Sequence, residues 1–117
     1  MRILRILPNL PVADVEAAKS FYTEYLGLSS EAFNLGWAAR YTSPDGKAIV
    51  QLVTGDATAP EDSVISVQTD DIEGAYEEAK KRGYEIVHPL ATEPWGVRRF
   101  FVRAPDGNVL NIAHYRD

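Results

Sequence analysis

Apolar positions recur with helical spacing in two segments of the chain. The first follows Asp14, whose side chain can cap a helix, and ends at Gly27, which can terminate one. Its apolar face is predicted to consist of Val15, Ala18, Tyr22 and Tyr25, with Phe21 and Leu26 beside it. The second segment follows Asp70 or Asp71 and ends at Gly83. Its apolar face is predicted to consist of Ile72, Ala75, Tyr76 and Ala79.

The other apolar segments are short and rich in β-branched and aromatic residues, which predicts strands. They comprise residues 3–9, 28–33, 37–42, 48–53, 63–68, 84–87, 97–103 and 108–114. Two connections carry the same Pro-Asp-Gly turn, at residues 44–46 and 105–107. Proline fixes φ at the first central position and glycine accepts a left-handed backbone, so each turn predicts a β-hairpin.

The chain therefore contains two copies of one unit. The Pro-Asp-Gly turns lie 61 residues apart, and the helix caps Asp14 and Asp71 lie 57 apart. The second copy thus carries about four more residues between its helix and its turn. We place this excess in a loop around Pro89–Gly96, which carries Trp95. The predicted organisation is a single domain over residues 1–117, with repeat one at 1–56, a linker at 57–62 and repeat two at 63–117.

Composition excludes several classes of partner and of chemistry for this chain. The 12 basic and 17 acidic side chains give a net charge of −5, which argues against nucleic acid or an anionic membrane as partner. The chain has no cysteine, which excludes disulfides and thiolate chemistry. No apolar segment is as long as a membrane span, and the N-terminus lacks the apolar core of a secretory signal. We therefore expect a cytoplasmic protein.

Two motifs carry a resemblance to a known family. The first, D-x-x-x-A-x-x-F-Y-x-x-x-L-G, consists of Asp14, Ala18, Phe21, Tyr22, Leu26 and Gly27. The second, R-x-P-D-G-N, consists of Arg103, Pro105, Asp106, Gly107 and Asn108. With the doubled unit, they make the chain resemble the vicinal oxygen chelate superfamily, which includes glyoxalase I, extradiol dioxygenases, and fosfomycin- and bleomycin-resistance proteins. The resemblance implies an α+β fold in which two tandem βαβββ units form a curved, U-shaped mixed sheet. The helices are expected on its convex face and the ligand on its concave face.

Enzymes of the superfamily hold a metal ion with residues on the first and last strands of each unit. Aligning the helices and turns places Leu7, Gln51, Val64 and Asn111 at those positions. None of the four offers a carboxylate or an imidazole to Zn²⁺, Ni²⁺ or Fe²⁺. We therefore expect no metal and no cofactor, and we assign no catalytic residue.

A ligand-binding role accounts better for these positions. Strand alternation places the amides of Gln51 and Asn111 on the concave side, with Leu7 and Val64. The aromatic side chains expected to form the wall of the cavity are Trp37, Tyr41, Trp95 and Phe101, with Arg99 as a charged anchor. For each aromatic residue taken alone, packing in the core or in a dimer interface is favoured over a ligand contact. Glu93, His88 and His114 are predicted to be exposed to solvent.

The segment Glu93-Pro94-Trp95-Gly96 and the strand after it look most like the bleomycin-resistance branch of the superfamily. That branch binds a drug as a homodimer without metal catalysis. The resemblance thus implies a homodimer that binds or sequesters a small, aromatic organic molecule, with Trp95 stacking on it. The alternatives are a glyoxalase-like lyase or isomerase with a displaced or absent metal, and a carrier for a pathway intermediate.

Overall fold

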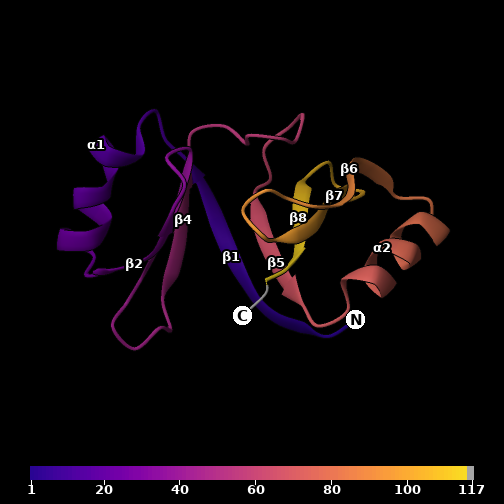
Figure 1. Ribbon diagram of the computed structural model, residues 1–117, viewed down its shortest axis with the longest axis horizontal. Coiled ribbons are helices and arrows are strands. Elements are labelled where there is room, and N and C mark those ends of the chain that lie inside the picture. The colour runs from indigo at the N-terminus through magenta and orange to yellow at the C-terminus, as the bar shows by residue number, and fades with distance from the viewer. Residues whose placement is uncertain (116–117) are drawn as a thin grey trace. The chain divides into compact units, whose positions relative to one another are not determined.

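A computed structural model describes residues 1–115 of the chain (Figure 1). Its elements are β1 (Ile3–Pro11), α1 (Val15–Ser20), a π-helical turn η1 (Phe21–Tyr25), β2 (Ser30–Asn34), β3 (Ala38–Thr42), β4 (Ile49–Val53), β5 (Ile65–Thr69), α2 (Ile72–Lys81), β6 (Glu85–Thr92), β7 (Arg98–Arg103) and β8 (Val109–His114). The strands are ordered β2-β3-β4-β1-β5-β8-β7-β6. β1 pairs parallel with β4 and β5 pairs parallel with β8, whereas the hairpins are antiparallel. The predicted α+β fold with two βαβββ copies and a mixed sheet is confirmed. No helix in the described range is long and apolar enough to cross a membrane.

The chain divides into two compact units. The N-terminal unit is Leu7–Thr58, and the C-terminal unit joins Met1–Ile6 to the residues from Ala59 onward. The start of the chain is fixed to the second copy, because the backbone N–H of Arg2, just before β1, donates to Asp70 Oδ1 at 3.0 Å. Arg5 Nε likewise donates to Gln68 Oε1 at 2.6 Å. The compact units therefore differ from the sequence repeats: the start of β1 lies in the first repeat of the sequence but belongs to the C-terminal compact unit.

The first helix begins as predicted but ends differently. Asp14 Oδ1 accepts hydrogen bonds from the N–H groups of Glu16 and Ala17, at 2.8 and 3.3 Å. The last turn is π-helical, so that Leu26 N–H bonds to the carbonyl of Phe21, five residues back. A π turn inserts one residue and rotates the side chains that follow it. The prediction that Tyr25 belongs to the buried face is therefore wrong, since Tyr25 is 77% exposed.

The core of the N-terminal unit lies between α1 and the sheet. Its buried members are Val15, Leu28, Ala39, Tyr41, Val50 and Leu52. β3 and β4 form the predicted hairpin, because Gly46 N–H bonds to the Ser43 carbonyl at 2.8 Å and Gly46 has φ of 74°. That φ lies in the left-handed region, which glycine adopts at little cost.

The core of the C-terminal unit lies between α2 and its strands. Its buried members are Val67, Ile72, Ala75, Ala79, Phe100 and Ile112. Asp71, and not Asp70, caps α2 by accepting a hydrogen bond from the Gly74 N–H at 3.0 Å. The β7–β8 hairpin closes through the Gly107 N–H and the Ala104 carbonyl, which are 2.9 Å apart.

The first half of the predicted loop around Pro89–Gly96 is strand. β6 continues through Pro89 to Thr92, with two register shifts against β7 at His88. β6 is an edge strand, where proline is tolerated because one row of N–H groups needs no partner. The additional residues of the second copy therefore lengthen and bulge a strand, and Trp95 lies in a tight turn closed by the Gly96 N–H and the Glu93 carbonyl at 2.9 Å.

Candidate functional site

The sheet of each unit has an apolar face toward its helix and a polar face on the opposite side. On β4, Val50 and Leu52 pack in the helix-side core, which leaves Gln51 on the polar face. On β8, Ile112 packs beside α2, which leaves Asn111 on the polar face. We call these surfaces the first polar face, in the N-terminal unit, and the second polar face, in the C-terminal unit. Both predicted amide positions are therefore buried on polar faces.

The first polar face centres on Gln51. Gln51 Oε1 accepts hydrogen bonds from Nε and Nη2 of Arg40, at 3.0 and 2.8 Å, and its Nε2 donates to Asn9 Oδ1 at 2.6 Å. The guanidinium of Arg40 lies 5.0 Å from the centre of the Phe33 ring. Leu7, two residues before Asn9 on β1, is fully buried. This face thus holds one buried cation among neutral amide groups.

The second polar face contains a buried amide whose hydrogen bonding is incomplete. Asn111 Nδ2 donates to Ser66 Oγ at 3.0 Å, and Asn111 is only 6% exposed. Its Oδ1 is buried and accepts no hydrogen bond from any described residue. A buried acceptor without a partner is costly, on the order of 1–3 kcal/mol. The oxygen can accept a hydrogen bond from an N–H or O–H group of another molecule.

A buried carboxylate lies on the same unit. Glu93 Oε2 accepts a hydrogen bond from Arg99 Nη2 at 3.2 Å, and His88 Nε2 lies 3.5 Å from Glu93 Oε1. His88 Nδ1 lies 2.6 Å from the Pro89 carbonyl, which can only accept, so Nδ1 carries a proton. The predicted solvent exposure of His88 and Glu93 is wrong, because both are buried. The extension of β6 is the physical reason, since it brings His88 into the sheet and Glu93 to its end.

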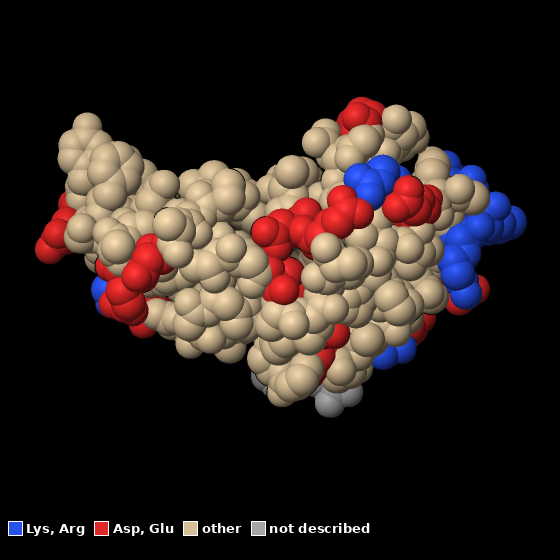
Figure 2. Space-filling model, turned by 90° about the horizontal axis from the view of Figure 1, so that it is seen from above, with Lys and Arg blue, Asp and Glu red and all other residues tan. Residues whose placement is uncertain are grey.

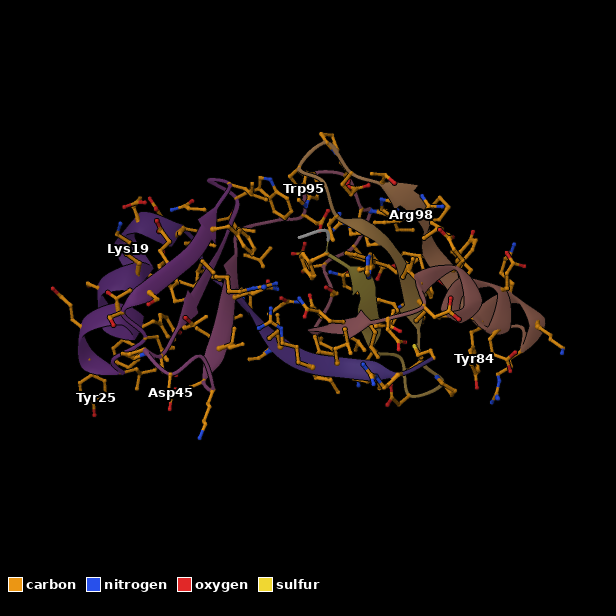
Figure 3. All side chains as sticks on the ribbon, turned by 60° about the horizontal axis from the view of Figure 1, so that its bottom comes forward. Lys19, Tyr25, Asp45, Tyr84, Trp95 and Arg98 are labelled. Carbon is orange, nitrogen blue, oxygen red and sulfur yellow. The ribbon has the colours of Figure 1, made fainter. Side chains whose placement is uncertain are left out.

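Two aromatic rings contact Arg99. Its guanidinium carbon is 5.0 Å from the centre of the Trp95 ring and 4.7 Å from that of Phe101. Phe100 packs in the core beside α2, so its neighbours Arg99 and Phe101 both lie on the opposite side of β7. Trp95 lies in the loop before that strand (Figure 3). A cation between aromatic rings is stabilised by their quadrupoles, by about 0.5–2 kcal/mol for each contact. Three of the predicted ligand residues therefore lie together.

The remaining predicted ligand residues lie elsewhere. Tyr41 packs in the helix-side core of the N-terminal unit, and its hydroxyl donates to Glu31 Oε1 at 2.8 Å. Val64 precedes β5 and is 48% exposed. Trp37 is half-buried at the start of β3, where its carbonyl accepts the N–H of Thr54 at 2.9 Å.

Strand register shows which first-strand residues face the two amides. Asn9 is the β1 partner of Gln51, and Ser66 is the β5 partner of Asn111. Both lie two residues after the positions that the alignment suggested, Leu7 and Val64. Both are polar residues within a strand, but only the register links each to its partner.

The two register pairs, Asn9 with Gln51 and Ser66 with Asn111, do not supply the ligands that the superfamily's metal ion requires. Asn9, Gln51, Ser66 and Asn111 offer neutral amide and hydroxyl oxygens, whereas transition metals prefer imidazole, thiolate and carboxylate ligands. Among residues 1–115, no group of three or more His, Cys, Asp or Glu side chains is arranged to hold a metal ion.

The surface reflects the excess of acidic over basic residues in the sequence. The face drawn in Figure 2 carries acidic side chains next to one another, whereas most of its basic side chains gather at one edge.

One acidic group, Glu31, has a hydrogen-bond partner in the core, the hydroxyl of Tyr41. The hydrogen bond from Tyr41 lowers the pKa of Glu31, and burial, followed by that hydrogen bond, raises the pKa of Tyr41.

Comparison with known proteins agrees with this fold and places the chain in a family. The sequence profile of the glyoxalase/bleomycin resistance protein/dioxygenase superfamily matches residues 2–112. The chain therefore belongs to this superfamily. No curated protein matches it.

Solved structures show the same fold. A superfamily member from Vibrio splendidus 12B01 is 21% identical, with a TM-score of 0.69, covering 97% of this chain and 99% of its own. An uncharacterized protein from Methanosarcina mazei is 24% identical, with a TM-score of 0.72, covering 99% of this chain and 95% of its own. Methylmalonyl-CoA epimerase from Mycobacterium tuberculosis is 18% identical, with a TM-score of 0.68, covering 95% of this chain and 87% of its own. At these identities the likeness concerns the fold alone.

Proposed function

We propose that this protein binds a small organic molecule without a metal ion, in the manner of the bleomycin-resistance branch of its superfamily. The observation that carries the proposal is the buried Oδ1 of Asn111, which no described residue satisfies. Buried acceptors are nearly always hydrogen-bonded, so an N–H or O–H group of a ligand is a natural partner for it. In this proposal Asn111 orients the ligand and selects a ligand that offers it an N–H or O–H donor.

The aromatic residues around Arg99 support an aromatic ligand. Trp95 is half-buried, so part of its ring is accessible, while its contact with Arg99 holds it in place. An aromatic ring next to a few oriented polar groups binds planar molecules by stacking. Sequestration of an antibiotic is the form of binding that the Glu-Pro-Trp-Gly segment favours.

A thermal-shift screen of antibiotics and aromatic metabolites tests this function. A ligand at about 100 times its dissociation constant adds about 2.7 kcal/mol to the free energy of unfolding. We expect at least one aromatic compound to raise the melting temperature, and chelator treatment to leave that shift unchanged. Shifts only with divalent metal ions would contradict the proposal.

We also propose that the protein works as a homodimer. The start of β1, which belongs to the C-terminal unit, exposes Leu4 and Ile6 on one face and Ile3 on the other, each about half accessible. Neighbouring apolar side chains of this size on a surface favour association. Light scattering should report about twice the chain mass, and a monomer at every concentration would contradict the dimer.

One observation favours a second candidate, a lyase or isomerase of glyoxalase type. His88 Nε2 and Glu93 Oε1 are 3.5 Å apart and buried, which is a suitable environment for moving a proton. In this alternative His88 transfers the proton and Glu93 positions its ring. A His88→Gln variant that binds the ligand normally but loses turnover would favour the enzyme over the binding protein.

A further inference from the structure

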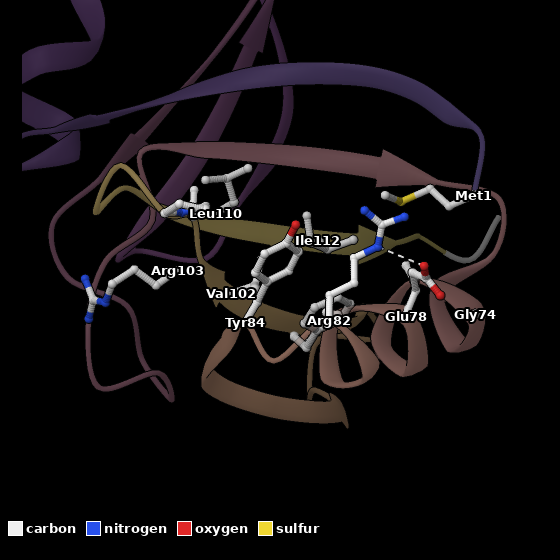
Figure 4. Close-up of a pocket in the computed structure, with 14 residues that line it drawn as sticks. Met1, Gly74, Glu78, Arg82, Tyr84, Val102, Arg103, Leu110 and Ile112 are labelled. Atoms are coloured by element: carbon white, nitrogen blue, oxygen red, sulfur yellow. Dashed lines mark hydrogen bonds and ion pairs between the residues drawn. The ribbon is translucent and has the colours of Figure 1, made fainter.

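The C-terminal unit contains a cavity that none of the predicted ligand residues lines. It lies between α2 and the helix-side faces of β7 and β8, with a volume of about 460 Å³ (Figure 4). Ligand cavities in proteins commonly measure about 300–1,000 Å³. The volume is therefore sufficient for a small molecule.

The inner surface of the cavity is apolar. Phe100 and Val102 from β7 and Leu110 and Ile112 from β8 form one side. The α2 side is formed by small residues, Gly74, Ala75 and Ala79, which leave the space open. A saturated hydrocarbon chain is the group that such walls accommodate, because they offer it no hydrogen-bonding partner and remove it from water.

The polar side chains that line the cavity are two arginines, one glutamate and one tyrosine: Arg82, Arg103, Glu78 and Tyr84. Two cations and one anion thus line the cavity, in a chain whose net charge is −5. Arg103 is already held by Glu61 and Glu85, at 2.5 and 3.2 Å. Arg82 is therefore the cation better placed to meet an anionic group.

The contacts of Arg82 leave it able to bind a carboxylate. Its hydrogen bond to Glu78 uses Nε, at 2.8 Å, and its side chain is 61% exposed. Hydrogen bonds to Glu78 and then to Tyr84 raise the pKa of Arg82, so the guanidinium stays charged and lies close to the phenol. Figure 4 shows Arg82 and Tyr84 side by side along the cavity. Guanidinium groups pair with carboxylates through two parallel N–H donors.

We propose that this cavity binds an amphipathic carboxylate of the fatty-acid class. The hydrocarbon chain lies among Phe100, Leu110 and Ile112, and the carboxylate pairs with Arg82 beside the hydroxyl of Tyr84. This site lies on the helix side of its sheet, opposite the second polar face. It is thus independent of the function proposed above.

Decanoate is a suitable probe, followed by amide and methyl NMR shifts of the full-length protein. We expect saturable shifts at Ala75, Ala79 and Leu110, with the side-chain amide of Asn111 and the indole N–H of Trp95 unaffected. Arg82→Gln should weaken decanoate binding about tenfold, the effect of losing one charge-assisted hydrogen bond. Arg98→Gln is the matched control, because Arg98 pairs with Glu73 on α2 but does not line the cavity. Decanol, which lacks the charge, should bind about as weakly to the native protein as decanoate binds to Arg82→Gln.

A second variant tests the hydrocarbon part. Ala79→Leu adds bulk to the α2 side of the cavity, and its far-UV circular dichroism should match that of the native protein while decanoate binding is lost. Three results would overturn the proposal: no saturable shift, shifts centred on Asn111 and Trp95, or equal effects of Arg82→Gln and Arg98→Gln.

Discussion

Asn111 on β8 donates its amide hydrogen to Ser66 Oγ on β5 at 3.0 Å, while its own carbonyl oxygen is buried without a partner among the described residues. The two residues are partners in the parallel register of β5 and β8. The backbone therefore fixes the side chain of Asn111, and Ser66 fixes its orientation, which leaves the oxygen available to a ligand.

Replacing Asn111 should separate stability from binding. Asn111→Leu removes an unsatisfied acceptor, but it also takes the amide donor away from the buried hydroxyl of Ser66. We expect the free energy of unfolding in urea to fall by about 1–2 kcal/mol and the shift caused by a screened ligand to disappear. Asn108→Leu, at an exposed position in the β7–β8 turn, should retain that shift. A retained shift in Asn111→Leu would remove Asn111 from the site.

Glu93 should be important for folding. Its side chain is 5% exposed and that of Arg99 is 4% exposed, so removing the carboxylate takes a buried ion-pair contact away from a buried cation. Glu93→Leu should lower the free energy of unfolding by about 3 kcal/mol. Glu73→Leu breaks the exposed pair with Arg98 and should cost less than about 1 kcal/mol. Equal losses in the two variants, measured by urea unfolding, would contradict the burial of the Glu93–Arg99 pair.

Stability should depend on pH through Tyr41 and Glu31. The pKa of Glu31 is lowered by the Tyr41 hydroxyl, so its contribution is present above the ordinary carboxyl pKa and is lost as the pH falls through the folded value. The pKa of Tyr41 is raised, so stability is also lost as the pH rises above the ordinary tyrosine value. In Tyr41→Phe the free energy of unfolding should therefore depend less on pH, both at the acidic and at the alkaline end of a profile from about pH 3 to about pH 12. Tyr25→Phe, at an exposed position, should leave the profile unchanged.

The β7–β8 turn should require glycine for conformational reasons alone. Gly107 has φ of 96°, and a Cβ added there would meet no atom within 4 Å. Gly107→Ala should therefore cost about 1–2 kcal/mol through backbone strain. Gly55 also has open space but no positive φ, so Gly55→Ala should be neutral or slightly stabilising. Equal melting temperatures for the two variants would show that the turn relaxes.

Trp95 should matter more for binding than for folding. It is half-buried and contacts Arg99, and it belongs to neither hydrophobic core. Trp95→Ala should cost about 1 kcal/mol of folding stability, the size of one cation–π contact, and weaken binding of an aromatic ligand. A loss of several kcal/mol with normal binding per folded molecule would make this tryptophan structural.

Sequence pattern predicted the order of the elements because caps and turns act locally. Asp14, Asp71 and the two Pro-Asp-Gly turns specify their structures within four residues, and each forms as expected. Tyr25 was misplaced because a π-helical turn leaves no mark in apolar periodicity. The continuation of β6 was missed because Pro89 favours a loop unless the strand lies at an edge, which only the topology shows.

The candidate site was predictable only in part. Gln51 and Asn111 follow from strand alternation, and both lie on polar faces as expected. The partners Asn9 and Ser66 depend on register between strands that are distant in sequence, which a local pattern does not encode. The burial of His88 and Glu93 depends on tertiary packing, whereas the charge of a side chain alone favours solvent.

Calorimetric titration of the best-binding screened compound into chelator-treated protein tests metal-free binding most directly. We predict saturable binding to about one site per chain, unchanged by added Zn²⁺ or Ni²⁺ and lost in Asn111→Leu. Binding that appears only when one of these metals is restored would contradict this account.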